Sequence, residues 1–195
     1  MTHFVYLHGF NSGYDPTNEK IKALEQIGTV SGITYDTFAH YPRILTSLLA
    51  GISYSDELVM VGTSLGGYWA ARVAENLKVP SVIINPVTDP ATSLAKYQDI
   101  NCQNYTTGKD NSLNEFAVTS YRGHELSNDV SFYYKPLVLC DRGDAVLSCT
   151  ATENVLSDMP MHTFQGGNHR FSHMQESLEL IQNYVRTCDI VEPVS

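Results

Sequence analysis

The stretch VGTSLGGYWAA, residues 61–71, places one serine among three glycines directly after an apolar run. The run over residues 58–61 predicts a buried strand, and residues 67–77 have the composition of a helix. Ser64 therefore lies at a predicted strand-to-helix junction. The spacing Gly-x-Ser-x-Gly is a weak signal by itself, because both residue types are common. Its meaning depends on what the rest of the chain supplies.

A junction of this kind predicts a sharp turn that holds Ser64 in a strained backbone conformation. Side chains two residues before and after the serine would collide in such a turn, which accounts for Gly62 and Gly66. Leu65 follows at the start of the helix, where amide N–H groups lack intrahelical partners and the helix dipole is positive. We therefore expect the Leu65 N–H to be available to a developing oxyanion.

The segment LHGFNSG, residues 7–13, supplies a second candidate donor. It follows the short apolar run Phe4–Leu7, which predicts a strand, and a glycine then allows the backbone to turn close to the site. The alternative is an ordinary strand exit that contains glycine. Together with the serine turn, the segment predicts an oxyanion hole formed by the N–H groups of Phe10 and Leu65.

A serine hydroxyl becomes a good nucleophile only when a base accepts its proton. His169 lies in QGGNHRF, residues 165–171, between the predicted strand 161–164 and the last predicted helix. The glycine-rich loop allows this imidazole to reach over the edge of a sheet, so His169 is the predicted base. His173 is its rival, although its position favours the beginning of the helix.

A catalytic histidine in turn needs a carboxylate to fix its tautomer and stabilise the imidazolium. The segment LCDRGDAVL, residues 139–147, follows a predicted strand and offers two aspartates. Asp144 lies further into the loop and is the predicted acid, whereas Asp141 is interpreted as capping the turn. Asp89, which follows the preceding strand, is a further candidate.

Short apolar strands alternate with amphipathic helices along the chain. The strands are predicted over residues 4–7, 29–35, 58–61, 80–85, 136–140 and 161–164. The helices are predicted over residues 15–27, 44–52, 67–77 and 173–188. This alternation predicts an α/β domain, 1–195, with a mostly parallel sheet covered by helices on both faces. The polar segment 88–133, rich in Tyr and Asn, is predicted to be a small cap inserted between two core strands.

The composition argues against several classes of partner. The formal net charge is −9, from 12 Lys and Arg against 21 Asp and Glu, so binding to nucleic acid or to an anionic membrane surface is not expected. The four cysteines form no CxxC pair and no metal-like cluster. No apolar stretch approaches the ~18 residues of a membrane span. We expect a cytoplasmic protein with reduced thiols whose chemistry requires no metal or organic cofactor.

Five segments carry a family resemblance: YLHGFNS, GTSLGGYWAA, INP, RGDAVL and NHRF. They resemble the esterases of the α/β-hydrolase superfamily, and more closely the small bacterial YqiA/YcfP-like family. The order Ser64, Asp144, His169 is that of the superfamily. The resemblance implies a three-layer α/β-hydrolase fold that lacks the leading antiparallel strands. It also implies a serine esterase that cleaves small acyl esters, or thioesters, through a Ser-Asp-His triad and an acyl-enzyme.

Two other functions are compatible with the same residues. The first is a ligand-binding or regulatory protein without catalysis, because this fold alone does not guarantee an activity. The second keeps the triad but transfers the acyl group to an acceptor other than water.

Overall fold

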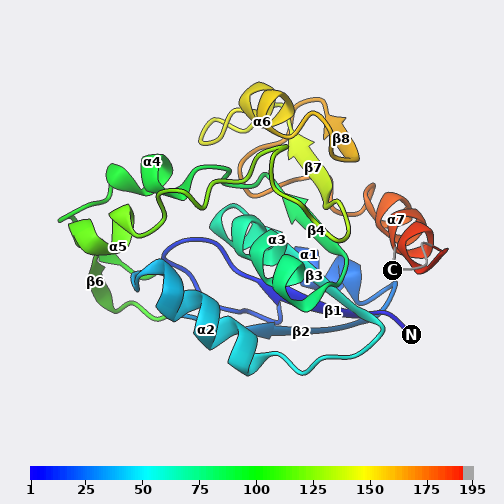
Figure 1. Cartoon of the computed structure of the whole chain (residues 1–195), viewed down its shortest axis with the longest axis horizontal. Helices are drawn as coiled ribbons and strands as arrows, with labels where there is room; N and C mark the ends of the chain where they lie inside the picture. Colours follow the sequence, from blue (N-terminus) through cyan, green and yellow to red (C-terminus); the bar gives the residue numbers. More distant parts are fainter. Residues whose placement is uncertain (191–195) are drawn as a thin grey trace.

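The computed structural model describes residues 1–190 and is built around a six-stranded parallel sheet with the order β2-β1-β3-β4-β7-β8 (Figure 1). The strands of this sheet are β1 His3–Leu7, β2 Thr29–Ile33, β3 Leu58–Thr63, β4 Ser81–Ile84, β7 Leu137–Asp141 and β8 Met161–Phe164. Each strand is parallel to its neighbours, so all six carboxyl ends lie along the same edge of the sheet. The three-layer α/β fold predicted from the sequence is confirmed.

Helices cover both faces of the sheet. They are α1 Glu19–Leu24, α2 Tyr41–Gly51, α3 Leu65–Leu77, α4 Pro90–Ala95, α5 Glu115–Thr119, α6 Cys149–Val155 and α7 Leu178–Ile190. α2 and α3 pack on one face and cross the near side of the sheet in Figure 1, while α1 and α7 pack on the opposite face. The sheet is thereby enclosed between two apolar layers.

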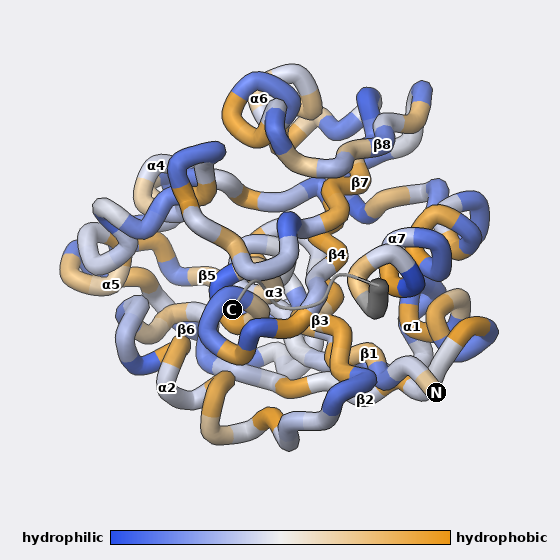
Figure 2. Tube along the Cα trace, turned by 45° about the vertical axis from the view of Figure 1, so that its right-hand side comes forward, coloured by the Kyte–Doolittle hydropathy of each residue, from blue (hydrophilic) through white to orange (hydrophobic). Residues whose placement is uncertain are grey.

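The central strand β3 shows why the apolar runs are continuous. All six of its residues are buried, because a parallel strand between two helix layers has no face exposed to water. Leu58 and Met60 pack toward α2 and α3, whereas Val59 and Val61 pack toward α1 and α7. Figure 2 shows the strands as a mostly hydrophobic centre surrounded by more hydrophilic loops.

Two helices begin later than the sequence predicted. Asn18, and not Asp15, caps α1, and its side chain accepts a hydrogen bond from the Lys20 N–H. The Asp15 carboxylate instead accepts from the Thr17 N–H and hydroxyl, at 2.8 and 2.7 Å, in a turn of its own. The last helix begins at Leu178, because the residues predicted to start it belong to a loop at the candidate site.

The segment 88–133 contains α4, α5 and a separate antiparallel hairpin of β5 Asn101–Gln103 and β6 Asp110–Ser112. Its far end is held against α3: the Tyr68 hydroxyl donates to the His124 carbonyl at 2.8 Å. Arg72 donates to the carbonyls of His124 and Glu125, also at 2.8 Å. That the segment caps the site remains a prediction.

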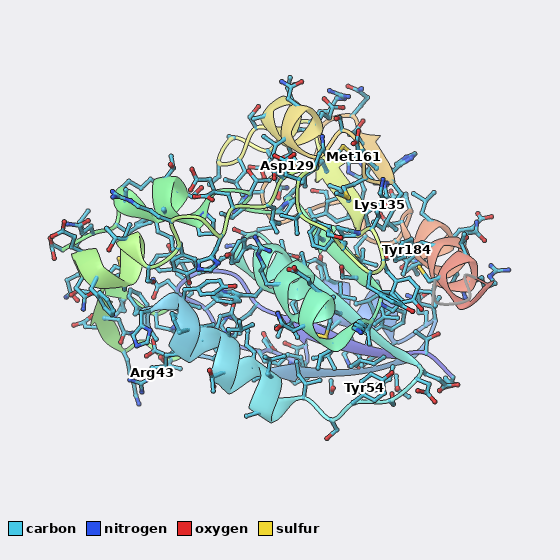
Figure 3. The ribbon with its side chains drawn as sticks, viewed as in Figure 1. Arg43, Tyr54, Asp129, Lys135, Met161 and Tyr184 are labelled. Carbon is cyan, nitrogen blue, oxygen red and sulfur yellow. The ribbon has the colours of Figure 1, made fainter. Side chains whose placement is uncertain are left out.

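α7 closes the far layer of the domain. Its Tyr184 hydroxyl donates to the Lys135 carbonyl at 3.0 Å, and the two residues lie next to each other in Figure 3. The same oxygen accepts from the Ser81 N–H at 3.4 Å. α7 is thereby attached to the segments that enter β4 and β7. Of the helices within residues 1–190, none combines the length and the apolar character needed to cross a membrane.

Candidate active site

Ser64 occupies the sharp turn between β3 and α3. Its φ of 59° and ψ of −124° are unfavourable for a residue with a side chain, and such a conformation costs about 1–3 kcal/mol. The backbone around it is fixed by hydrogen bonds: its N–H donates to the Ile84 carbonyl at 2.9 Å, and its carbonyl accepts from the Gly67 and Val87 N–H groups. The turn therefore holds the serine at the carboxyl edge of the sheet.

Glycines allow this turn to lie directly against the end of β1. A Cβ atom at Gly62 would overlap the Gly66 carbonyl, and one at Gly66 would overlap the Leu7 carbonyl. The space is therefore filled by backbone on both sides, which accounts physically for the Gly-x-Ser-x-Gly spacing. Gly9 lies on the other side of Ser64, where an added Cβ would be 3.6 Å from the serine Cβ.

The structure brings together the three residues predicted to form a triad. The Nε2 atom of His169 lies 3.1 Å from the Ser64 Oγ, and its Nδ1 atom lies 2.8 Å from the Asp144 Oδ2. The His169 side chain is 29% exposed, whereas that of Asp144 is 1% exposed. A buried carboxylate, a partly exposed imidazole and the serine hydroxyl thus form one continuous chain of hydrogen bonds.

The environment of Asp144 keeps its carboxyl group ionised. Burial is the largest single influence on its pKa and raises it, but the hydrogen bonds from His169, Leu147 and Val146 together outweigh burial. The pKa of Asp144 therefore lies below its ordinary value. An ionised carboxylate can only accept, so Nδ1 of His169 carries the proton and Nε2 faces the serine hydroxyl as an acceptor.

The other candidates take structural positions. The Nδ1 atom of His173 lies 2.6 Å from the Asp141 Oδ1, and His173 is not hydrogen-bonded to Ser64. Asp89 caps α4, where its carboxylate accepts from the Thr92 N–H at 3.0 Å and hydroxyl at 2.6 Å. These contacts favour His169 over His173 as the candidate base, and Asp144 over Asp89 as the candidate acid.

Asp141 does more than cap a turn. Its fully buried carboxylate accepts from the backbone N–H groups of Asn168 and Ser172, at 3.0 and 2.8 Å, in addition to its contact with His173. Both N–H groups belong to the loop that carries His169. Asp141 therefore anchors this loop at the end of β7.

Asn85, at the end of β4, completes this anchor and was not identified from the sequence. Its Oδ1 accepts from the Asp141 N–H at 2.8 Å, while its Nδ2 donates to the carbonyls of Asn168 and His169 at 3.0 and 3.3 Å. Its φ of 39° lies in the left-handed region that asparagine tolerates better than most residues. In the sequence, Asn85 is part of the segment INP, which contributes to the family resemblance but does not predict these contacts.

The two predicted oxyanion donors belong to segments next to Ser64. Leu65 is the first residue of α3, and Phe10 follows Gly9, whose added Cβ would lie 4.0 Å from the Ser64 Oγ. Among the groups of residues 1–190, neither the Phe10 N–H nor the Leu65 N–H finds a hydrogen-bond acceptor. Both N–H groups are thus free to donate to a ligand, as the predicted oxyanion hole requires.

His8 supports the loop that follows β1. Its Nδ1–H donates to the Gly9 carbonyl at 2.9 Å, and its Nε2 accepts from the Tyr35 N–H at 3.2 Å. The rings of His8 and Tyr35 stack, with their centroids 4.4 Å apart. Burial lowers the pKa of His8 from its ordinary value of 6.5 to about 4, although the Gly9 contact opposes this. His8 is therefore neutral and structural at neutral pH.

Because His8 is buried in its neutral form, the free energy of unfolding is expected to depend on pH. Because the folded-state pKa of His8 lies below that of the unfolded chain, its contribution is fully present above pH 6.5 and is lost as the pH falls toward 4. The loss attributable to His8 is about 3 kcal/mol at most. Urea unfolding from pH 7.5 to 4.5 should show a shallower decline in the free energy of unfolding for His8→Gln. Parallel curves for the two proteins would contradict this expectation.

The parallel sheet and the serine at the β3–α3 turn define the α/β-hydrolase fold, and solved structures agree. Est1E from Butyrivibrio proteoclasticus is 16% identical, with a TM-score of 0.69 over 97% of this chain and 87% of that one. The esterase domain of a Rhodothermus marinus protein is 14% identical, with a TM-score of 0.67 over 95% of this chain and 87% of that one. Likeness at this level of identity shows the fold alone.

Comparison with related sequences assigns the chain to one family. A family model matches residues 3–186, and the chain belongs to the uncharacterised protein family UPF0227. A UPF0227 protein of Shewanella sp. strain MR-7 is 28% identical over 188 residues, which are 92% of this chain and 97% of the relative. The UPF0227 protein YcfP of Escherichia coli O9:H4 strain HS is 26% identical over 194 residues, with the same coverage. The resemblance to the YqiA/YcfP-like family is confirmed.

Proposed function

We propose that this protein is a serine hydrolase that cleaves small acyl esters through an acyl-enzyme. The observation that supports this most directly is the chain of hydrogen bonds from Asp144 through His169 to Ser64. The backbone strain at Ser64 is a second support, because such strain is retained where function requires it. The esterase structures that share this fold agree with the proposal.

In the proposed reaction, the Ser64 Oγ attacks the acyl carbonyl carbon while the Nε2 of His169 accepts the hydroxyl proton. The new C–O bond moves an electron pair onto the carbonyl oxygen, where the N–H groups of Phe10 and Leu65 stabilise the charge. Asp144 stabilises the imidazolium and holds its orientation.

Collapse of the tetrahedral intermediate then re-forms the carbonyl and breaks the bond to the leaving group. His169 returns its proton to the leaving oxygen, and the acyl group remains on Ser64. Water attacks this ester with His169 again as the base, which releases the acid and restores the hydroxyl. A thioester would follow the same steps with a thiol as the leaving group, and transfer would replace water by another acceptor.

A fluorophosphonate probe tests the nucleophile independently of the natural substrate. It should modify the wild-type protein once, on the peptide that contains Ser64, because only an activated serine reacts quickly. The same preparation is then assayed with p-nitrophenyl esters of increasing acyl length and with acyl-coenzyme A compounds. Absence of both labelling and turnover in correctly folded protein would favour the non-catalytic, ligand-binding alternative.

A further inference from the structure

We propose that the β5–β6 hairpin of the segment 88–133 positions the Phe10 N–H for the oxyanion. This inference rests on the proposed function, since it assigns a role to the inserted segment in the same reaction. It is carried by hydrogen bonds that connect the hairpin to residues 11 and 12, immediately after the proposed donor. In Figure 1 the chain after β1 extends toward the side of the molecule that holds β6 and α5.

Asn11 makes the first connection. It is 3% exposed, and its φ of 55° turns the chain directly after Phe10. Its Nδ2 donates to the Gln103 carbonyl at 2.8 Å, and its own carbonyl accepts from the Tyr105 N–H at 3.0 Å. Its N–H donates to the Thr37 hydroxyl at 3.1 Å. Two of these three bonds come from the hairpin: they hold the Asn11 side chain and the peptide between Asn11 and Ser12, while Thr37 holds the peptide between Phe10 and Asn11.

Asn104 makes the second connection from within the hairpin turn. Its Oδ1 accepts from the N–H groups of Thr106 and Thr107, at 2.9 and 2.8 Å, which shapes the turn. Its Nδ2 donates to the Ser12 carbonyl at 3.3 Å. One side chain therefore forms the hairpin turn and holds the loop, so the two segments are placed relative to each other.

The ring of Phe10 is held from the same side. Its centroid lies 5.0 Å from that of Tyr97, shortly before β5, and 4.9 Å from that of Phe38. The inserted segment thus contacts the ring of Phe10 and the residue that follows it. The Oδ1 of Asn11 is buried and, among the described residues, has no hydrogen-bond partner. The orientation of this amide is consequently set by its single bond to Gln103.

An oxyanion donor is effective only when it already lies about 2.7–3.1 Å from the position of the charge, and removing one costs about 10²–10³ in kcat. A loop that leaves a strand is mobile unless other groups hold it. Asn11 and Asn104 are accordingly positioning residues, and loosening them should cost a fraction of what losing the donor would cost.

The test uses Asn11→Gly, which accommodates the positive φ but lacks the bond to Gln103, and Asn104→Ala, which lacks the bond to Ser12. The matched control is Asn101→Ala, an exposed residue of the same hairpin whose side chain, among residues 1–190, has no hydrogen bond. Each protein is assayed with p-nitrophenyl acetate, and fluorophosphonate labelling counts the active sites. Inhibition by phenylboronic acid, which forms a tetrahedral adduct on serine, is measured in parallel.

Both variants should lose about 10-fold in kcat per labelled site, with KM changed less than twofold, because the donor acts mainly on the transition state. The inhibition constant for phenylboronic acid should rise by a similar factor, and the control should match the wild type. An unchanged kcat per labelled site in both variants, or a loss confined to the number of labelled sites, would overturn the inference. A wild-type protein without turnover would instead defeat the proposed function, and this inference with it.

Discussion

Replacing Ser64 by alanine is expected to lower kcat for an ester substrate by about a million-fold, because the residues of a triad act as a unit. Without the hydroxyl there is no acyl-enzyme, and His169 has no proton to accept from the protein. The measurement is the steady-state hydrolysis of p-nitrophenyl acetate by protein purified separately from any wild-type preparation. Retention of more than about 1% of the wild-type kcat would contradict the assignment of Ser64 as nucleophile.

Ser64→Gly provides the companion measurement for this prediction. It removes the same hydroxyl and should abolish the same activity, but glycine adopts a φ of 59° without the penalty that serine pays. The free energy of unfolding should therefore rise by about 1 kcal/mol relative to Ser64→Ala. A loss of activity together with a gain in stability separates the role of the hydroxyl from damage to the fold.

The second large effect is expected on folding. A Cβ atom at Gly66 would overlap the carbonyls of Leu7 and His8. Leu7 is the last residue of β1 and is paired with β3, so its carbonyl cannot move without disturbing that pairing. Gly66→Ala should therefore destabilise the protein by about 4 kcal/mol or more, as measured by urea unfolding. It should also lower the yield of folded protein.

Gly123→Ala is the control for that substitution. Gly123 has a φ of +78°, and an added Cβ would meet nothing within 4 Å, so only the backbone conformation is penalised. Its expected cost is about 1 kcal/mol. Equal destabilisation by the two substitutions would show that close backbone approach at the serine turn is not the reason for its glycines.

The main sheet could be predicted from the sequence because its strands are short, continuous apolar runs between turn residues. The strand predicted over residues 161–164 has the bounds of β8, and β3 is only two residues longer than the strand predicted over residues 58–61. The helix boundaries were less accurate, since Asp15-Pro16 has the local chemistry of a helix start but is used as a separate turn. The β5–β6 hairpin was missed because its polar residues show no alternation.

The candidate triad could also be predicted, since each member follows a strand and parallel strands bring their carboxyl ends together. The contacts that hold the His169 loop could not. Asp141, His173 and Asn85 are far apart in the sequence, and each has an ordinary interpretation as a turn or helix-start residue. Their roles depend on buried hydrogen bonds between loops, which local patterns do not encode.

The strand order has a consequence for where this fold receives a ligand. The chain first winds outward from β1 to β2 and then continues in the opposite direction through β3, β4, β7 and β8. The connection that leaves β1 therefore leads to α1 on one face, whereas the one that leaves β3 leads to α3 on the other. In open α/β sheets, small molecules bind where such connections diverge. The point of divergence lies between β1 and β3, so a ligand is expected at their carboxyl ends, next to Ser64.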